Sequence, residues 1–351
     1  MKHESNVTLN AGEKIGLISN LSTMLAAGLP IFEVVLSLSE DAKGNQKKIL
    51  DALLEDLTQG KRVHTSFARF PRVFDKVTVS VVNASEEAGT LVTTLKDLRE
   101  NIRKQMEFND KVKSALLYPI FIFGVFFAVL GFILVFVIPK VADVFIHLKI
   151  KLPLPTRILI FLSKTLTGNP IALVVIIAVI GGLVFLIMRY KRNWVTGILF
   201  SLPLISHIVK LIDFTRFTRS MHLLLYSGLP ITEALELTQD MCVKRQSSKV
   251  IKACSEMVLS GKKLSQGLRQ SKGYVPGIMV KLIEAGEKTG TLDQSMQDIS
   301  EYFDYEVSQA LKTFLTLLEP IMLVVIGVVV GGMMLSVIAP IYGLISQVGG
   351  K

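Results

Sequence analysis

The chain has 351 residues, half of them hydrophobic, and its mean hydropathy is +0.50. This composition is too apolar for an ordinary soluble protein of that length, so we expect a membrane protein. The formal charge of +10 lies mostly beside the apolar stretches, where anionic lipid headgroups account for it without nucleic acid. The two cysteines, Cys242 and Cys254, have the spacing of neither a metal knuckle nor a redox motif, which is typical of buried thiols in a reducing compartment.

Three stretches without a charged side chain are long enough to cross a bilayer, because about 20 apolar residues span the hydrocarbon core. The predicted membrane spans are residues 114–139, 165–188 and 320–340. The N-terminal tail, residues 1–10, has no apolar core of the kind that a cleaved signal needs. Lys and Arg near the spans are more frequent on the side of the N-terminus, which places that end inside and the C-terminal tail, residues 341–351, outside. Residues 140–164 then form an outer loop.

Residues 11–113 are predicted to form a helical domain, because apolar residues recur there at intervals of three and four. Such intervals are seen at Ile15, Ile18, Leu21 and Leu25. The phrase Gly28-Leu29-Pro30 predicts a tight helix hairpin. Gly closes one helix in the left-handed conformation, Leu contacts the helix end, and Pro is tolerated at the start of the next helix. A binding loop is the alternative role for this phrase.

A second phrase of the same domain sets acids beside a glycine, ahead of a long helix that runs into the first span. It contains Glu86, Glu87 and Gly89, followed by Thr90 as a candidate helix cap. We expect that such a helix could carry movement of the inside domain to the span. The alternative is that the acids only stabilise a helix N-terminus.

The chain repeats itself after roughly 200 residues. The hairpin phrase returns as Gly228, Leu229 and Pro230, and the acidic phrase returns as Gly286, Glu287 and Gly290. Thr291 and Gln294 form a predicted capping box there. The segment 189–319, with a core at about 212–313, is therefore a second helical domain. Because one extra span, 165–188, lies between the two repeats, both domains face the inside.

The spans carry few groups that could do chemistry. The positions of interest for membrane entry and packing are Tyr118, Pro119, Glu319, Pro320, Gly327, Gly331 and Pro340. An acid near hydrocarbon could relay protons, but the place of Glu319 at the very start of a span favours a packing or pairing role. Gly327 and Gly331 form a small-residue face that favours close helix packing.

Motifs for catalysis and cofactor binding are missing. Gly60-Lys61 and Gly261-Lys262 lack the upstream Gly and the following Ser or Thr of a phosphate-binding loop. The histidines have no metal-ligand spacing, and no nucleophile elbow occurs. We therefore expect no cofactor, no metal and no enzymatic activity.

Taken together, these motifs resemble the inner-membrane platform proteins of type II secretion systems and type IV pili, the GspF/PilC family. The matching phrases are the two Gly-Leu-Pro-Ile junctions, the acid-Gly-Thr-Leu phrases, Tyr118-Pro119, Glu319-Pro320, Leu152-Pro153-Leu154-Pro155-Thr156-Arg157, Leu202-Pro203-Leu204-Ile205 and Arg216-Phe217-Thr218-Arg219. The resemblance implies an all-α membrane protein with two repeated cytoplasmic antiparallel helix bundles and three transmembrane helices. The outer loop and the C-terminus would be periplasmic.

The resemblance also implies a function. Such a protein would couple a cytoplasmic assembly ATPase to pilin or pseudopilin subunits, and lift them from the bacterial inner membrane into a filament. Other inner-membrane assembly proteins, the lipid bilayer and further copies of the chain would be partners. One alternative is a membrane transport or channel subunit, suggested by the internal repeat. Another is a membrane enzyme such as a prepilin peptidase, which would need paired carboxylates, whereas the spans offer only Glu319.

Overall fold

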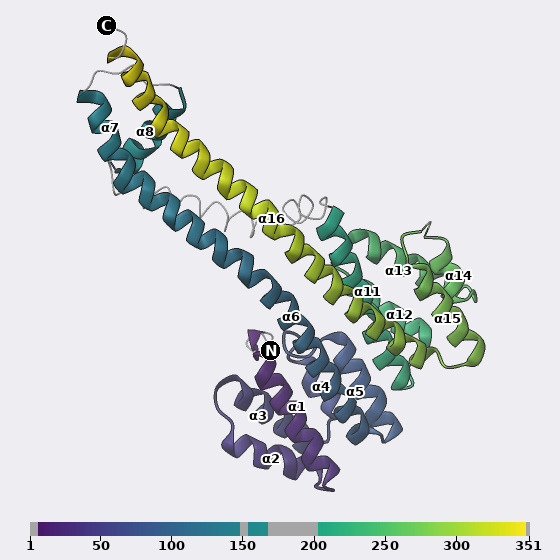
Figure 1. The fold of residues 1–351 in the computed structure, drawn as a ribbon. Coiled ribbons are helices and arrows are strands. Elements are labelled where there is room, and N and C mark those ends of the chain that lie inside the picture. Colours follow the sequence, from purple (N-terminus) through teal and green to yellow (C-terminus); the bar gives the residue numbers. More distant parts are fainter. Residues whose placement is uncertain (1–5, 148–153, 168–202, 272, 349–351) are drawn as a thin grey trace. The chain divides into compact units, whose positions relative to one another are not determined.

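A computed structural model describes residues 6–147, 154–167, 203–271 and 273–348 (Figure 1). Within these ranges the chain forms helices and connecting turns, with no strand, so the predicted all-helical class is confirmed for the described residues. The predicted second span, 165–188, lies outside them from residue 168 onward. The chain divides into two compact units. We call residues 1–111 with 207–309 the bundle unit, and residues 112–206 with 310–351 the apolar unit.

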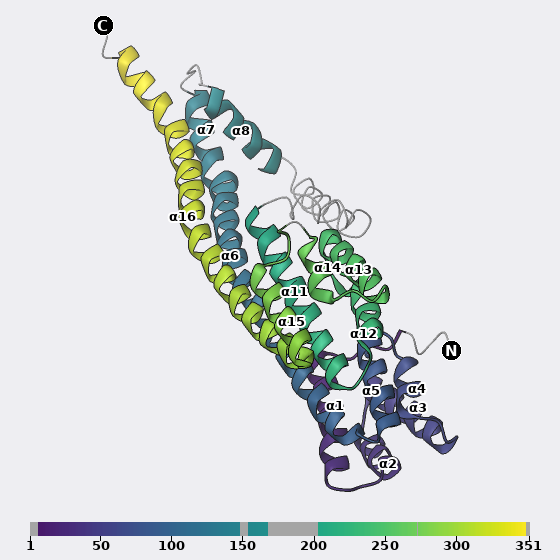
Figure 2. The ribbon, with the colours of Figure 1, turned by 90° about the vertical axis from the view of Figure 1, so that its right-hand side faces the viewer.

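The bundle unit holds two groups of helices in the same order (Figure 2). The N-terminal group consists of α1 (Ala11–Ala26), α2 (Ile31–Asp41), α3 (Gly44–Thr58), α4 (Val63–Ala68), α5 (Lys76–Ala88) and the start of α6 (Leu91–Phe132). The C-terminal group consists of α11 (Pro203–Tyr226), α12 (Ile231–Thr238), the 3-10 turn Gln239–Met241, α13 (Arg245–Leu259), α14 (Leu264–Arg269), α15 (Gly277–Thr289) and the start of α16 (Leu292–Val348). Consecutive helices pack on one another from α1 to α5 in the first group and from α12 to α15 in the second.

Each group has its own apolar core. In the N-terminal group Phe67 and Phe74 stack with ring centroids 3.9 Å apart, and both rings are buried. In the C-terminal group Phe214 of α11 stacks on Phe303 of α16 at 5.6 Å. Burying one such ring contributes roughly 1.5–3 kcal/mol, so each group is held together by side chains that its helical periodicity already places on one face.

Both Gly-Leu-Pro phrases form hairpin junctions. Gly28 and Gly228 adopt φ of 87° and 85°, a conformation that favours glycine. Pro30 and Pro230 then stand as the N-cap residues of α2 and α12. The leucines differ, however. Leu229 is 7% exposed, as expected of an apolar residue that packs past a helix end, whereas Leu29 is 40% exposed.

The apolar unit contains the rest of the two long helices. The C-terminal part of α6 is followed by a π-helical turn at Ile133–Val137, by α7 (Ile138–His147) and then by α8 (Leu154–Thr167). The predicted outer loop, 140–164, is thus helical at both ends. Two side chains of α8 tie this unit together: Ser163 Oγ donates to Leu134 O at 2.7 Å, and Thr156 Oγ1 donates to Ser336 O of α16 at 2.6 Å.

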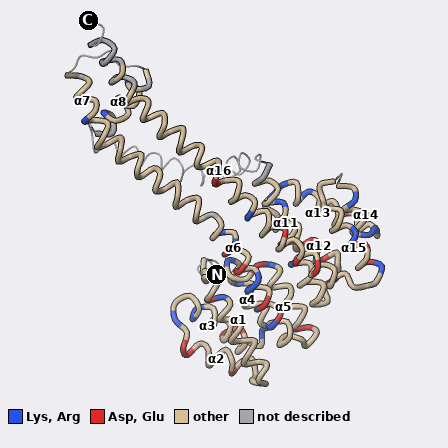
Figure 3. Tube along the Cα trace, viewed as in Figure 1, with Lys and Arg blue, Asp and Glu red and all other residues tan. Residues whose placement is uncertain are grey.

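Two described helical stretches are long and apolar enough to cross a membrane. They lie within residues 91–145 and 292–338, and their most apolar windows are largely exposed in the single chain. Figure 3 shows charged residues throughout the bundle unit and few of them along the apolar parts of α6 and α16. An exposed, uncharged helical surface of this length is costly in water and suits a lipid environment.

Candidate functional site

The acid of the second repeated phrase caps a neighbouring short helix. Glu86 lies near the end of α5, and its Oε1 accepts from Val63 N at 2.6 Å while its Oε2 accepts from His64 N at 3.1 Å. The His64 ring adds a contact at 2.6 Å between Nδ1 and Oε2. Arg62, the N-cap residue of α4, offers no side-chain cap of its own. Since the first N–H groups of a helix have no intrahelical acceptor, the carboxylate of Glu86 stabilises the start of α4.

The same arrangement returns in the C-terminal group. Glu287 of α15 accepts from Ser265 N at 3.2 Å and from Ser265 Oγ, at the start of α14. Lys263, the N-cap residue of α14, again lacks a side-chain cap. The repeated acid therefore stabilises the N-terminus of a short helix in each group. That helix is α4 or α14, and not the long helix that follows the acid in the sequence.

Other residues of these phrases close the preceding helix. Gly89 and Gly290 follow α5 and α15 in the left-handed conformation, with φ of 70° and 76°. Glu87 is exposed, and its nearest cation, on Arg62, is 3.9 Å away. The capping box expected at the start of α16 is not formed: the Thr291 hydroxyl pairs with Thr289 Oγ1 at 2.7 Å, and the Gln294 amide donates to Asp298 at 3.0 Å. A capping box does occur at Asn10 and Glu13, ahead of α1.

Gly286 lets α15 approach the start of α16. A Cβ at this position would collide with Ser295 Oγ and would lie 3.1 Å from Leu292 Cα. We expect Gly286→Ala to destabilise the protein by roughly 1–3 kcal/mol, because overpacking at a helix contact forces backbone shifts. Thermal unfolding of the full-length protein in detergent measures the loss.

Gly277→Ala is the matched control for Gly286→Ala, because a Cβ on this glycine of the same helix meets no atom within 4 Å. It should leave the melting temperature unchanged or raise it slightly. Adding Ser295→Gly to Gly286→Ala should restore part of the loss. A Gly286→Ala protein as stable as the control would show that the two helices need no close approach here.

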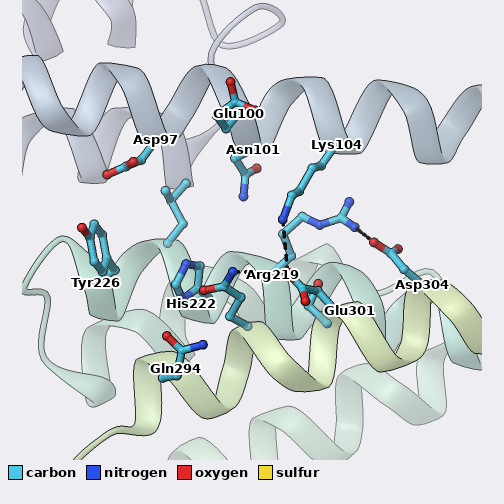
Figure 4. Close-up of a pocket in the computed structure, with 13 residues that line it drawn as sticks. Asp97, Glu100, Asn101, Lys104, Arg219, His222, Tyr226, Gln294, Glu301 and Asp304 are labelled. Carbon is cyan, nitrogen blue, oxygen red and sulfur yellow. Dashed lines mark hydrogen bonds and ion pairs between the residues drawn. The ribbon is translucent and has the colours of Figure 1, made fainter.

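The two helix groups of the bundle unit meet at a cavity of about 280 Å³ (Figure 4). Lys104 of α6 pairs with Glu301 of α16, with 3.3 Å between Nζ and Oε1. Arg219 of α11 is buried and pairs with Asp304 of α16. The Arg219 guanidinium also lies over the Phe108 ring, 5.6 Å from its centre. The Lys104–Glu301 pair and the cation–π contact thus join the two groups, and the largely buried Arg219–Asp304 pair, within the C-terminal group, holds the guanidinium that lies over Phe108.

Burial raises the pKa of Asp304, against the opposing influence of the Arg219 guanidinium. Burial likewise raises the pKa of Asp97, on the α6 side of the cavity. Over the described residues, no set of His, Cys, Asp and Glu is arranged to hold a metal ion. The cavity joins opposite charges, which suits a connection between α6 and α16. Of these side chains only Arg219 belongs to a motif of the sequence, as part of a family phrase, because ion-pair partners on different helices leave no local pattern.

The predicted membrane positions lie along the two long helices. Pro119 is inside α6, and Pro320 and Pro340 are inside α16. Tyr118 and Glu319 are exposed in the single chain. A Cβ on Gly327 or Gly331 would meet no atom within 4 Å. The small-residue face is therefore open within the described residues, and its close packing against another span or another subunit stays a prediction.

The chain is similar in sequence to a known protein family and to several named proteins. The model of the family described as Type II secretion system (T2SS), protein F matches twice, at residues 17–139 and 217–340. The chain is 28% identical to Type II secretion system protein F of Pseudomonas aeruginosa, over 97% of this chain and 85% of the relative. It is 26% identical to Type IV pilus assembly protein PilC of Thermus thermophilus, over 93% of this chain and 80% of the relative.

Type IV pilus assembly protein PilC of Pseudomonas aeruginosa is 27% identical over 97% of this chain and 94% of its own length. The two family matches start about 200 residues apart, as the repeated phrases do. They leave only the ends of the chain and a central segment unmatched. Since these matches cover well over half of the chain, it belongs to the type II secretion system protein F family.

Proposed function

We propose that this protein is a multi-pass platform of the bacterial inner membrane that serves a type IV pilus or type II secretion machine. It couples a cytoplasmic assembly ATPase to the incorporation of pilin or pseudopilin subunits into a filament. Relatives named for both secretion and pilus assembly support the choice of machine. The observation that carries the mechanical role is the passage of α6 and α16, each one continuous helix, from the bundle unit into the apolar unit.

The proposed topology has three spans, with both helix groups in the cytoplasm and the C-terminus in the periplasm. The apolar parts of α6 and α16 supply the first and third spans. The second span, 165–188, is needed to return the chain to the cytoplasm, because two domains lie on the same side of a membrane only if an even number of spans separates them. The charge pattern beside the spans supports a cytoplasmic N-terminus. The two helix groups would then be repeated cytoplasmic bundles.

The coupling would be mechanical: movement would be transmitted through the ends of helices, and no chemical step would be involved. The start of α6 follows the C-cap glycine of α5, and the start of α16 follows that of α15. The Lys104–Glu301 pair links the two long helices within the bundle unit, and Arg219 of α11 contacts both of them, through Asp304 of α16 and the Phe108 ring of α6. A partner that shifts one helix group would therefore act on both long helices, since a continuous α-helix moves as a stiff element over this length.

The test is a crosslinked pull-down of the tagged full-length protein in mild detergent from cells that make it, with partners identified by mass spectrometry. Recovery of an assembly ATPase together with pilin-like subunits is the expected result, and the identity of these subunits tells pilus from secretion. If neither is recovered, and vesicles with the purified protein alone move an ion or solute, the platform proposal fails in favour of a transport subunit.

A further inference from the structure

The helix α8 buries polar side chains against the rest of the apolar unit. It packs on α7 and on the π-helical turn at Ile133–Val137. Thr156 is 4% exposed and Ser163 is 1% exposed. The Thr156 hydroxyl donates to the backbone carbonyl of Ser336, and the Ser163 hydroxyl donates to that of Leu134. Because one acceptor lies on α16 and the other on the turn that continues α6, α8 connects the two long helices within this unit.

The opposite face of α8 is apolar and exposed. Leu154, Ile158 and Phe161 are 73%, 58% and 72% exposed, and their spacing of three and four residues places them on one stripe of the helix. Thr165 is exposed on the same stripe, and its Oγ1 donates to Phe161 O within the helix at 2.8 Å, so its hydroxyl needs no water as a partner. A helix in water has its polar residues outside and its apolar residues inside. The reversed arrangement of α8 therefore indicates an apolar environment.

Two cations lie beside the apolar stripe. Arg157 and Lys164 are both exposed, and their separation of about two helical turns places them on one side of α8. The helix contains no Asp or Glu. Lys and Arg beside an apolar face are typical of helices that lie in a membrane interface. There the long side chains reach the anionic headgroups, while the apolar face contacts the acyl chains.

The two attachment points of α8 lie at similar depths along the long helices. Leu134 and Ser336 fall within the two helical stretches that are long and apolar enough to cross a membrane. Each stands within five residues of the outer end of a predicted span, which is roughly 6–8 Å inside the bilayer at 1.5 Å per residue. An interfacial helix buries its apolar face by about 5–10 Å, so both depths suit such a helix. Leu335, beside Ser336, is likewise apolar and 69% exposed.

We propose that α8 lies in the outer leaflet of the membrane, with Leu154, Ile158 and Phe161 against lipid acyl chains. The side of the helix that carries Arg157 and Lys164 is then level with the anionic headgroups. The segment that the sequence predicts as an outer loop is partly a membrane-embedded helix. Through its two buried hydroxyls, this helix holds the outer parts of α6 and α16 together, since each long helix accepts a hydrogen bond from it.

Spin labels at single introduced cysteines test this placement. Full-length protein with Phe161→Cys is labelled with a thiol-specific nitroxide and reconstituted into vesicles of phosphatidylcholine and phosphatidylglycerol. Power saturation then compares how often the label collides with oxygen, which concentrates in the bilayer, and with a nickel complex that stays in water. Burial raises the pKa of the native Cys242 and Cys254 thiols to about 12, so near pH 7 the introduced exposed thiol reacts first.

Three further labels provide the references. His147→Cys, at the exposed end of α7, marks a position in water, and Leu335→Cys marks the lipid-facing side of α16. The oxygen-to-nickel ratio at Phe161→Cys should be several-fold higher than at His147→Cys and close to that at Leu335→Cys. Lys164→Cys should give an intermediate ratio, because it lies at the headgroups. A Phe161→Cys label as open to nickel as His147→Cys would overturn the proposal, and so would a label closed to both reagents, because protein would then cover this face.

This inference rests on the proposed membrane topology and not on the proposed partners, so the two can fail separately. If the Leu335→Cys label collides with oxygen while the Phe161→Cys label collides with nickel, the span topology stands and the placement of α8 is wrong. If the Leu335→Cys label is itself open to nickel, α16 does not cross the membrane there, and the topology fails together with the placement of α8. The recovery of an assembly ATPase in the pull-down changes neither result.

Discussion

Charge reversal at Glu287 is expected to abolish filament assembly while membrane insertion stays intact. The substitution Glu287→Lys removes the carboxylate that accepts from Ser265 at the start of α14 and puts a cation there instead. Loss of bonds to a charged acceptor costs roughly 1.5–3 kcal/mol each, and a cation is unfavourable at a helix N-terminus. The junction between α15 and α16 is then no longer fixed to α14. Counting surface filaments or secreted substrate, together with membrane fractionation, checks both parts of the prediction.

Glu87→Lys is the matched control, since it makes the same change at an exposed acid whose nearest cation lies at 3.9 Å. It should assemble filaments normally. Gly290→Val should share the defect of Glu287→Lys, because a β-branched residue is strongly disfavoured at φ of 76°. If Glu287→Lys and Gly290→Val both assemble filaments as the wild type does, the phrase serves only to cap helices, and its role in coupling is refuted.

The largest expected loss of stability in the N-terminal group follows from Asp56→Ala. The Asp56 side chain is 1% exposed. It accepts from Lys61 and Arg69, each at 2.9 Å, and from Ser66 at 2.8 Å. Removing it takes away an acceptor that two cations and a hydroxyl share. Breaking a fully buried pair costs roughly 3–5 kcal/mol, and because Lys61 is half exposed we expect about 3 kcal/mol here.

Hydrogen exchange of the full-length protein, measured by mass spectrometry, locates this loss. Amides of α3 and α4 should exchange faster in Asp56→Ala, whereas those of α13 and α14 provide an internal control, since Met257 stands at the position equivalent to Asp56. Glu55→Ala, which removes an exposed neighbour, should change little. Unchanged exchange in α3 and α4 of Asp56→Ala would show that this cluster does not hold the two helices together.

The same cluster predicts a pH dependence. Burial by itself would raise the pKa of Asp56, but hydrogen bonds from Lys61, Ser66 and Arg69 together lower it below its usual value of 3.8. A folded-state pKa below the unfolded one means that the unfolded chain binds the proton more readily. The contribution of the Asp56 charge is thus present above about pH 5 and is lost as pH falls through the folded-state pKa. The melting temperatures of wild type and Asp56→Asn should therefore converge in acid.

The sequence by itself determined the features that depend on neighbouring residues. Apolar residues at three- and four-residue intervals predict helices, and α1 and α3 are found where these intervals occur. Glycine followed by proline marks the hairpins at Gly28 and Gly228, because only glycine adopts their φ readily. The repeat and the family follow from the same short phrases, since the family model matches both copies.

Only the tertiary structure decided which residues meet across helices. Glu287 and Ser265 lie 22 residues apart in the sequence, and Lys104 and Glu301 lie 197 apart. No periodicity relates such positions, because helical spacing fixes the face of a helix and not the helix that it packs against. Val77 and Ile278 show the same limit: the sequence makes them equivalent, yet one is buried and the other exposed. The helical pattern gives both residues the same place on a helix, but it does not say which neighbouring helix lies over that place.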